Sequence, residues 1–412
     1  MKIRKIGKLK LSIQQKDILA FFGALYLFLT MQPFFIWSLK VVSLIYIIPF
    51  LVMIYPVALE SRFRFSYNHA IIFTTLLIYI TYIALPLFGK ELLLGKYLLF
   101  APFLLLLFVS SASIEGIFTI WRKILIFFVI YALIIYLLFA LKVDIPYWVL
   151  ENRDKIPITS RAEHFFRAYG LVVSSTNTLW RIGGVLTMRL CGPFAEPGHL
   201  GIYIGFTMLI DRFMRKKNNW ILLTGGLLTL SPAFLLILII IELHRIINDK
   251  RINWKLFIII LFGFTVLSII KGPEIKDRLL YITIERHSDL NKRSPIVVRQ
   301  RFADFLKTSK VITGVGKEEF QEFGGSLSDP RGIIAKFGLI GLVLSLFIIF
   351  LFLAEVDKKH KLFLLTAVLL VYSHRVWMFE SVYIYMFMLI ASAVSKKELI
   401  KENDDITKTE LP

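Results

Sequence analysis

The sequence is poor in the residues that build disulfides and metal sites. Cys191 is the single cysteine among 412 residues, which excludes an intramolecular disulfide and a cysteine-rich metal centre. The seven histidines contain no pair at a ligand spacing such as H-x-x-x-H. We therefore expect no metal and no other cofactor.

Acidic residues are also scarce, since 29 Asp and Glu stand against 49 Lys and Arg, a net charge of +20. In a soluble protein this charge would suggest binding to nucleic acid. However, the chain has no recognised nucleic-acid-binding motif, and many of its cations flank long apolar runs, as the positive-inside rule requires of membrane proteins. We therefore expect no nucleic-acid partner.

Apolar residues are abundant, at 57% of the chain, whereas soluble globular proteins have about 45–50%. The excess lies in uncharged runs of roughly 18–24 residues, the length that crosses about 30 Å of hydrocarbon. This pattern predicts an all-α polytopic membrane protein, with residues 1–412 forming a single integral membrane domain in the lipid bilayer. The basic N-terminus leads into a full-length run without a small-residue cleavage site, so we expect the first span to remain.

The basic flanks predict cytoplasmic termini and about 12 transmembrane helices, within a range of about 10–12. Residues 143–195 are expected to form the first large external loop, 272–330 the second, and 396–412 a cytoplasmic tail. Outside one ambiguous stretch, the expected spans are 18–37, 41–59, 70–88, 92–110, 121–141, 198–212, 254–271, 332–354, 361–376 and 380–395.

The ambiguous stretch is Trp220–Leu243. As one span it places Arg245, Lys250 and Arg251 outside, against the positive-inside rule. As two short helices broken at Thr229–Pro232 it returns to the cytoplasm, although each half of about 11 residues is too short to cross alone. We favour the broken hairpin because every later basic cluster then falls inside.

Ionisable residues gather where the span near residue 198 begins, and such residues at a membrane boundary usually persist for function. Pro197 can start the helix at its first turn, which puts Glu196 at the N-cap, beside free N–H groups and the positive end of the helix dipole. His199 follows on the same helix face. Either Glu196 caps the helix and pairs with Arg189, or its carboxylate handles a proton or orients a sugar hydroxyl, with His199 beside it.

Two further features concern packing. Gly198, Gly201 and Gly205 are spaced for close contact between this helix and a neighbour. Arg375 and Glu380 are the charges of the last hairpin, and we expect them to pair across its turn.

The centre of the second loop is basic. Between residues 286 and 310 the acids are Asp289 and Asp304, and the cations are Arg286, Lys292, Arg293, Arg299, Arg301, Lys307 and Lys310. Arginines in an external loop suit an anionic ligand, because a guanidinium binds phosphate bidentately. A solvated amphipathic helix explains the same charges, and both interpretations stay open. The following Gly-x-Gly, at 313–316, lacks nucleotide-loop spacing and is expected to be a turn.

Four segments resemble the motifs of one known family in order and spacing. RLCGPFAEPGHLG (189–201) is similar to an arginine, glycine-aromatic, Glu-Pro segment leading into a helix, and LLTLSPAFLLILI (227–239) to a Thr-x-Ser-Arg hairpin, with Pro232 in place of the arginine. VVRQRFADFLKTSKVITGVG (297–316) resembles an arginine helix followed by Gly-x-Gly, and SDPRGIIAKFGLIGL (328–342) the start of the next span. Together with the expected topology, they resemble the bacterial O-antigen polymerase family, the Wzy type, and its relative the O-antigen ligase.

This resemblance implies a metal-independent glycosyltransferase in the bacterial cytoplasmic (inner) membrane. It would polymerise undecaprenyl-diphosphate-linked repeat units into a surface polysaccharide, the O-antigen of lipopolysaccharide or a capsule, with a flippase and a chain-length regulator as partners. The candidate catalytic residues are Glu196, His199 and Arg299. The candidate substrate-binding residues are Arg189, Arg301, Arg293 and Arg181.

Two alternatives stay open. One is an O-antigen ligase or another glycosyltransferase that uses lipid-linked glycans. The other is a transporter or flippase for such glycans, which predicts a charged path through the spans. The sequence places few ions there, namely Lys96, Arg375 and Glu380.

Overall fold

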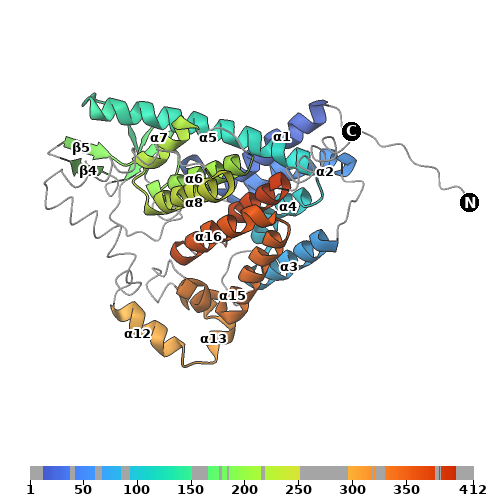
Figure 1. The fold of residues 1–412 in the computed structure, drawn as a ribbon. Helices are drawn as coiled ribbons and strands as arrows, with labels where there is room; N and C mark the ends of the chain where they lie inside the picture. Colours follow the sequence, from blue (N-terminus) through green and yellow to red (C-terminus); the bar gives the residue numbers. More distant parts are fainter. Residues whose placement is uncertain are drawn as a thin grey trace, which may run out of the picture.

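A computed structural model describes residues 13–37, 42–60, 67–84, 93–150, 166–175, 179–182, 185–214, 219–250, 296–316, 319–320, 330–375, 380 and 382–395. Within these ranges the protein is mostly helical (Figure 1). The predicted span 254–271 and tail 396–412 lie outside the described residues, as does much of the predicted second loop.

The first part of the chain contributes long apolar helices joined by short connections. They are α1 (Ile13–Thr30), η1 (Phe34–Ile36), η2 (Val42–Tyr46), α2 (Ile47–Glu60), α3 (Tyr67–Ala84), α4 (Leu93–Leu106) and α5 (Ser111–Ala140). Ser110 caps α5, because its hydroxyl accepts a hydrogen bond from the Ser113 N–H at 3.3 Å. α1 packs along α5, and Gly23 makes room there for the side chain of Ile117.

The second part of the chain forms the rest of the bundle. Its described helices are α6 (Pro197–Phe213), α7 (Trp220–Leu228), α8 (Pro232–Asp249), α12 (Ile296–Phe305), α13 (Lys310–Thr313), α15 (Pro330–Ala354), α16 (Lys358–His374) and a last helix (Tyr383–Ser395). α6 packs against both α7 and α8, and α16 packs against α8.

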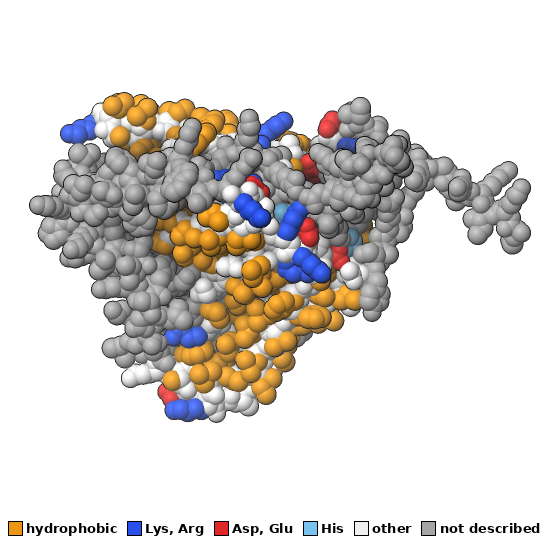
Figure 2. Space-filling model, viewed as in Figure 1, with side chains coloured by type: hydrophobic (Ala, Val, Ile, Leu, Met, Phe, Trp, Pro, Cys, Tyr) orange, Lys and Arg blue, Asp and Glu red, His pale blue; other side chains and the backbone are white. Residues whose placement is uncertain are grey.

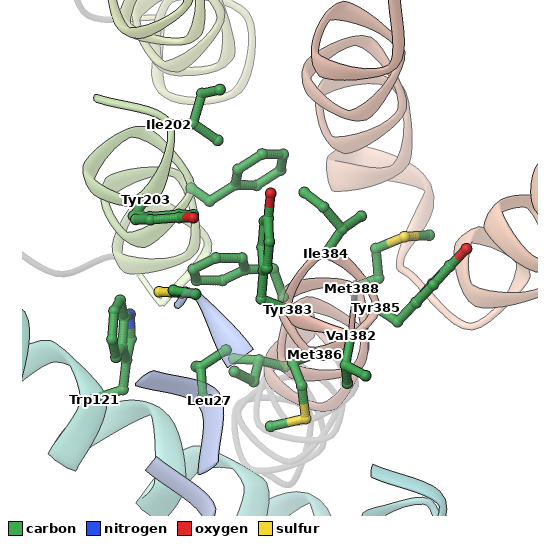
Figure 3. Packing of buried hydrophobic residues seen from close by; sticks show 14 of the residues in the cluster. Leu27, Trp121, Ile202, Tyr203, Val382, Tyr383, Ile384, Tyr385, Met386 and Met388 are labelled. Atoms are coloured by element: carbon green, nitrogen blue, oxygen red, sulfur yellow. The ribbon is translucent and has the colours of Figure 1, made fainter. Parts of the chain in front are cut away.

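α6 lies at the centre of the bundle. Of its residues only Arg212 is not buried, which is typical of a helix that neighbours cover on all sides. Tyr203 of α6 meets Tyr383 of the last helix edge to face, with ring centroids 5.2 Å apart (Figure 3). The predicted glycine face is confirmed, because a Cβ on Gly201 would lie 2.7 Å from Ser231 Cβ and one on Gly205 2.9 Å from Ile237 Cδ1.

Among the described residues, two helices are long and apolar enough to cross a membrane, α5 and α15. They carry large apolar side chains that face outward, such as Leu137, 57% exposed, and Val343, 63% exposed. Figure 2 shows hydrophobic side chains on the visible faces of α5 and of the region around α15. This agrees with a helical membrane protein, while the total of about 12 spans stays a prediction.

The predicted break in Trp220–Leu243 is confirmed. α7 ends at Leu228, and α8 begins at Pro232 after Ser231, which caps α8 by accepting a hydrogen bond from the Phe234 N–H at 3.5 Å. Leu230 between them has a positive φ of 48°, which no helix accommodates. α8 is longer than expected, since it continues to Asp249.

The prediction of an all-α fold missed strands within the predicted first loop. β1 (Trp148–Leu150), β2 (Phe166–Tyr169) and β3 (Val172–Ser175) form an antiparallel sheet, and β4 (Leu179–Ile182) pairs with β5 (Val185–Met188). The strands have three or four residues each. Such runs are too short for the alternation of polar and apolar residues to stand out in the sequence.

Helix ends contact one another at both ends of the bundle. At the predicted outer end, the Phe34 N–H after α1 donates to Pro193 O before α6 at 2.9 Å, and the hydroxyl of Tyr82 near the end of α3 donates to Phe337 O in α15 at 2.9 Å. At the other end, His244 of α8 contacts His360 of α16. The residues at the start of α6 therefore lie at the predicted outer end.

Candidate functional site

The site begins where the chain enters α6. Glu196 holds the N-cap position with extended backbone, and Pro197 occupies the first turn, as predicted. The predicted side-chain cap is wrong, since the carboxylate of Glu196 makes no capping hydrogen bond to the helix. It is directed to side chains instead.

Glu196, His199 and Arg375 form a compact cluster. Arg375 Nη1 lies 2.5 Å from Glu196 Oε2 and 3.2 Å from His199 Nε2, and His199 Nε2 lies 3.7 Å from Glu196 Oε2. Because arginine carries no acceptor, His199 Nε2 accepts this hydrogen bond, and a neutral ring then holds its proton on Nδ1. The cluster therefore combines a carboxylate, an imidazole and a guanidinium.

Arg375 reaches this place from the opposite end of the sequence. It follows α16 directly, and its guanidinium lies against the first turn of α6, where Gly198 has no side chain. A Cβ on Gly198 would lie 2.7 Å from Arg375 Nη2. The predicted pair between Arg375 and Glu380 is wrong, because Glu380 pairs with Lys336 of α15. Sequence reasoning missed Arg375 at the site, and the glycine after Glu196-Pro197 was the signal of a close approach.

Arg189 stabilises the break between α7 and α8. Its Nε donates to Thr229 O and its Nη2 to Leu230 O, both at 3.0 Å. These are carbonyls that the end of α7 leaves without helix partners. The predicted partner of Glu196 was Arg189, but the structure pairs Glu196 with Arg375. Arg189 instead binds the backbone between α7 and α8.

A second place with predicted site residues lies on α12 and α13. Arg301 is exposed and lines an open pocket of about 740 Å³ together with Asp304, Lys310 and Glu319. Lys310 Nζ lies 2.8 Å from Glu319 Oε2, so cations and carboxylates are mixed there. Arg299 belongs to α12 and Arg181 to β4, but their side chains lie outside the described part, as does all of Arg293.

The predicted Gly-x-Gly turn attaches α12 and α13 to α15. The Val315 N–H donates to Ala335 O at 2.8 Å, and the hydroxyl of Tyr82 lies 3.1 Å from Thr313 O. Figure 1 shows α12 at one edge of the molecule, with α15 and α16 between it and α6. The structure therefore places α12, which carries Arg299 and Arg301, on a different helix layer from Glu196.

Further ion pairs lie at the opposite end of the bundle. Arg122 Nε lies 2.6 Å from Asp211 Oδ2, and Arg212 pairs with Asp249. Within the described ranges, no three His, Cys, Asp or Glu side chains lie together in a way that could hold a metal ion.

No protein-family model, curated protein or solved structure matches the chain. The chemistry of the site therefore rests on its own residues. A carboxylate and an imidazole can accept a proton from a hydroxyl, and the adjoining guanidinium can hold an anion or stabilise developing negative charge.

Proposed function

We propose that the protein polymerises undecaprenyl-diphosphate-linked oligosaccharide repeat units into a surface polysaccharide, on the outer face of the bacterial cytoplasmic membrane. The observation that carries this proposal is the cluster of Glu196, His199 and Arg375 at the predicted outer end of the bundle. The cluster combines proton acceptors with a cation. Transfer of a glycan from a diphosphate to a hydroxyl needs both kinds of group.

In the proposed reaction, a hydroxyl oxygen of one repeat unit forms a bond to the anomeric carbon of another. The bond between that carbon and the diphosphate oxygen breaks, and the undecaprenyl diphosphate leaves with the electron pair. Glu196 takes the hydroxyl proton, or His199 does so once Arg375 no longer donates to its Nε2. We assign stabilisation of the leaving diphosphate to cations, without a metal ion. The sequence offers Arg299, Arg301 and Arg189, of which Arg189 lies nearest in the chain to Glu196 and the other two belong to α12.

The contacts between the quoted segments support the proposal. Arg189 of the first segment binds carbonyls of the second, at Thr229 and Leu230. Val315 of the third binds Ala335 of the fourth. The segments singled out by their resemblance to one family therefore meet in two pairs, the first with the second and the third with the fourth.

The described part of α6 favours surface chemistry over transport. Between His199 and Asp211 its polar side chains are Tyr203 and Thr207, and Thr207 donates to the Tyr203 carbonyl within the helix. The charged groups thus lie at the two ends of α6, with apolar residues between them. A transporter would need charged or polar groups along the path itself.

The test is complementation of a source strain that lacks this gene, with its polysaccharide separated on a gel. A polymerase predicts one repeat unit on the lipid A core in the deletion strain and a ladder after complementation. Absence of any repeat unit would indicate a ligase instead. Unchanged polymerisation by the Glu196→Gln, Arg299→Ala double variant would refute the site.

A further inference from the structure

We propose that Arg375 binds the diphosphate of the lipid-linked substrate, and that it leaves Glu196 when it does so. This inference rests on the proposed function for the identity of the diphosphate. It assigns a role to a residue outside the four family-like segments, at the end of α16.

The Arg375–Glu196 pair is accessible to a ligand. The side chains of Arg375 and Glu196 are 26% and 32% exposed, whereas those of Lys336 and Glu380 are 14% and 18% exposed. A diphosphate can therefore approach Arg375 from the predicted outer end of the bundle without opening the apolar core.

The guanidinium also has N–H groups that can make a first contact with the diphosphate before the pair with Glu196 breaks. Both contacts of its side chain with described residues, to Glu196 and to His199, involve Nη1 alone. Within the described residues, Nε and Nη2 make no hydrogen bond. Two parallel N–H groups on one planar fork match phosphate oxygens, which is why arginine binds phosphate bidentately.

The carboxylate of Glu196 occupies a position on Arg375 that a phosphate group of the substrate can take. Its carboxylate carries one negative charge, and the diphosphate of the substrate carries more, so the incoming group competes for Arg375. Once Arg375 binds the diphosphate, the carboxylate of Glu196 no longer contacts the positive charge of Arg375 and becomes a better proton acceptor. Binding of the donor thereby prepares the group that takes the proton of the acceptor hydroxyl.

The test measures binding to the full-length protein in phosphatidylcholine nanodiscs, with undecaprenyl diphosphate as the probe. Arg375→Gln should weaken binding about 10- to 100-fold, the effect of one charge-assisted hydrogen-bonded contact. Glu196→Gln removes the competing carboxylate and should tighten binding by about 3- to 10-fold. Opposite changes in affinity for the probe in Arg375→Gln and Glu196→Gln distinguish a ligand site from a purely structural ion pair.

Arg245→Gln is the matched control, because it also removes an arginine paired to a glutamate, Glu242 at 2.9 Å, but on α8 near the opposite end. It should bind the probe as the wild type does. Thermal melting of each variant shows whether it is folded, and Glu196→Gln tests the idea independently if Arg375→Gln does not fold. Equal affinity of wild type, Arg375→Gln and Glu196→Gln would overturn the inference.

Two further arms identify the source of the anion. Inorganic pyrophosphate should compete with the probe, and phosphatidylglycerol added to the nanodiscs should not. Competition by phosphatidylglycerol would show a general site for anionic headgroups and would overturn the assignment. Arg375-dependent binding in a protein that fails to restore a ladder would refute the proposed function and leave the diphosphate site standing.

Discussion

Replacing Gly338 with alanine is expected to detach the Gly-x-Gly turn from α15. Gly338 interrupts α15 with a positive φ of 67° and lies against the backbone at the end of α13. A Cβ there would lie 2.2 Å from Ile312 O and 2.6 Å from Gly314 N. These neighbours are backbone atoms, so a change of side-chain rotamer cannot relieve the clash.

Two costs add up in this variant. Holding a residue with a side chain at this backbone conformation costs about 1–3 kcal/mol. Overpacking in a tight contact costs about 1–3 kcal/mol more. The docked state should therefore lose about 2–6 kcal/mol, which corresponds to at least about 30-fold in the population of the undocked form.

Hydrogen exchange measured by mass spectrometry reads out this change at Val315, whose N–H donates to Ala335 O at 2.8 Å. Exchange at Val315 should accelerate at least about 30-fold in Gly338→Ala if local opening limits it. Gly116→Ala is the control, because its nearest neighbour is Ala20 Cβ at 3.4 Å. Equal protection of Val315 in Gly338→Ala and wild type would refute the close approach of the two backbones.

Three other variants test contacts of the bundle. Lys336→Ala leaves Glu380 without its partner and should destabilise the protein by about 3 kcal/mol in denaturant titration, whereas removing both charges should recover much of the loss. His244→Ala removes the 2.8 Å contact between its Nε2 and His360 Nδ1 and should cost about 1–3 kcal/mol, and an unchanged melting temperature would contradict it. Arg189→Met leaves the two carbonyls between α7 and α8 without this donor and should lower stability by about 2–3 kcal/mol, read as faster proteolysis of the break.

The local features of the fold were predictable because they depend on near neighbours in the chain. The start of α6 at Pro197 and the break at 229–231 follow from the backbone limits of proline and from capping. Both are confirmed. The strands between 148 and 188 were missed, because pairing between segments stabilises them more than their own residue pattern does.

The candidate site was predictable only in part. Glu196 and His199 were found because they are three residues apart on one helix, so their proximity is a property of the sequence. Arg375 was assigned to the wrong partner, because residues close in sequence were expected to pair. Its contact with His199 joins residues 176 positions apart, which no local pattern reveals.

The sequence by itself determined that this chain forms apolar helices, that Trp220–Leu243 breaks into two of them, and which ionisable groups stand at the start of α6. Hydrophobicity, proline and glycine act over a few residues, so their effects can be predicted along the chain. The tertiary structure decided which cation meets Glu196, because the bare first turn of α6 at Gly198 lets the end of α16 come close. Packing between helices, more than their order in the chain, therefore decides which charged residues meet at the candidate site.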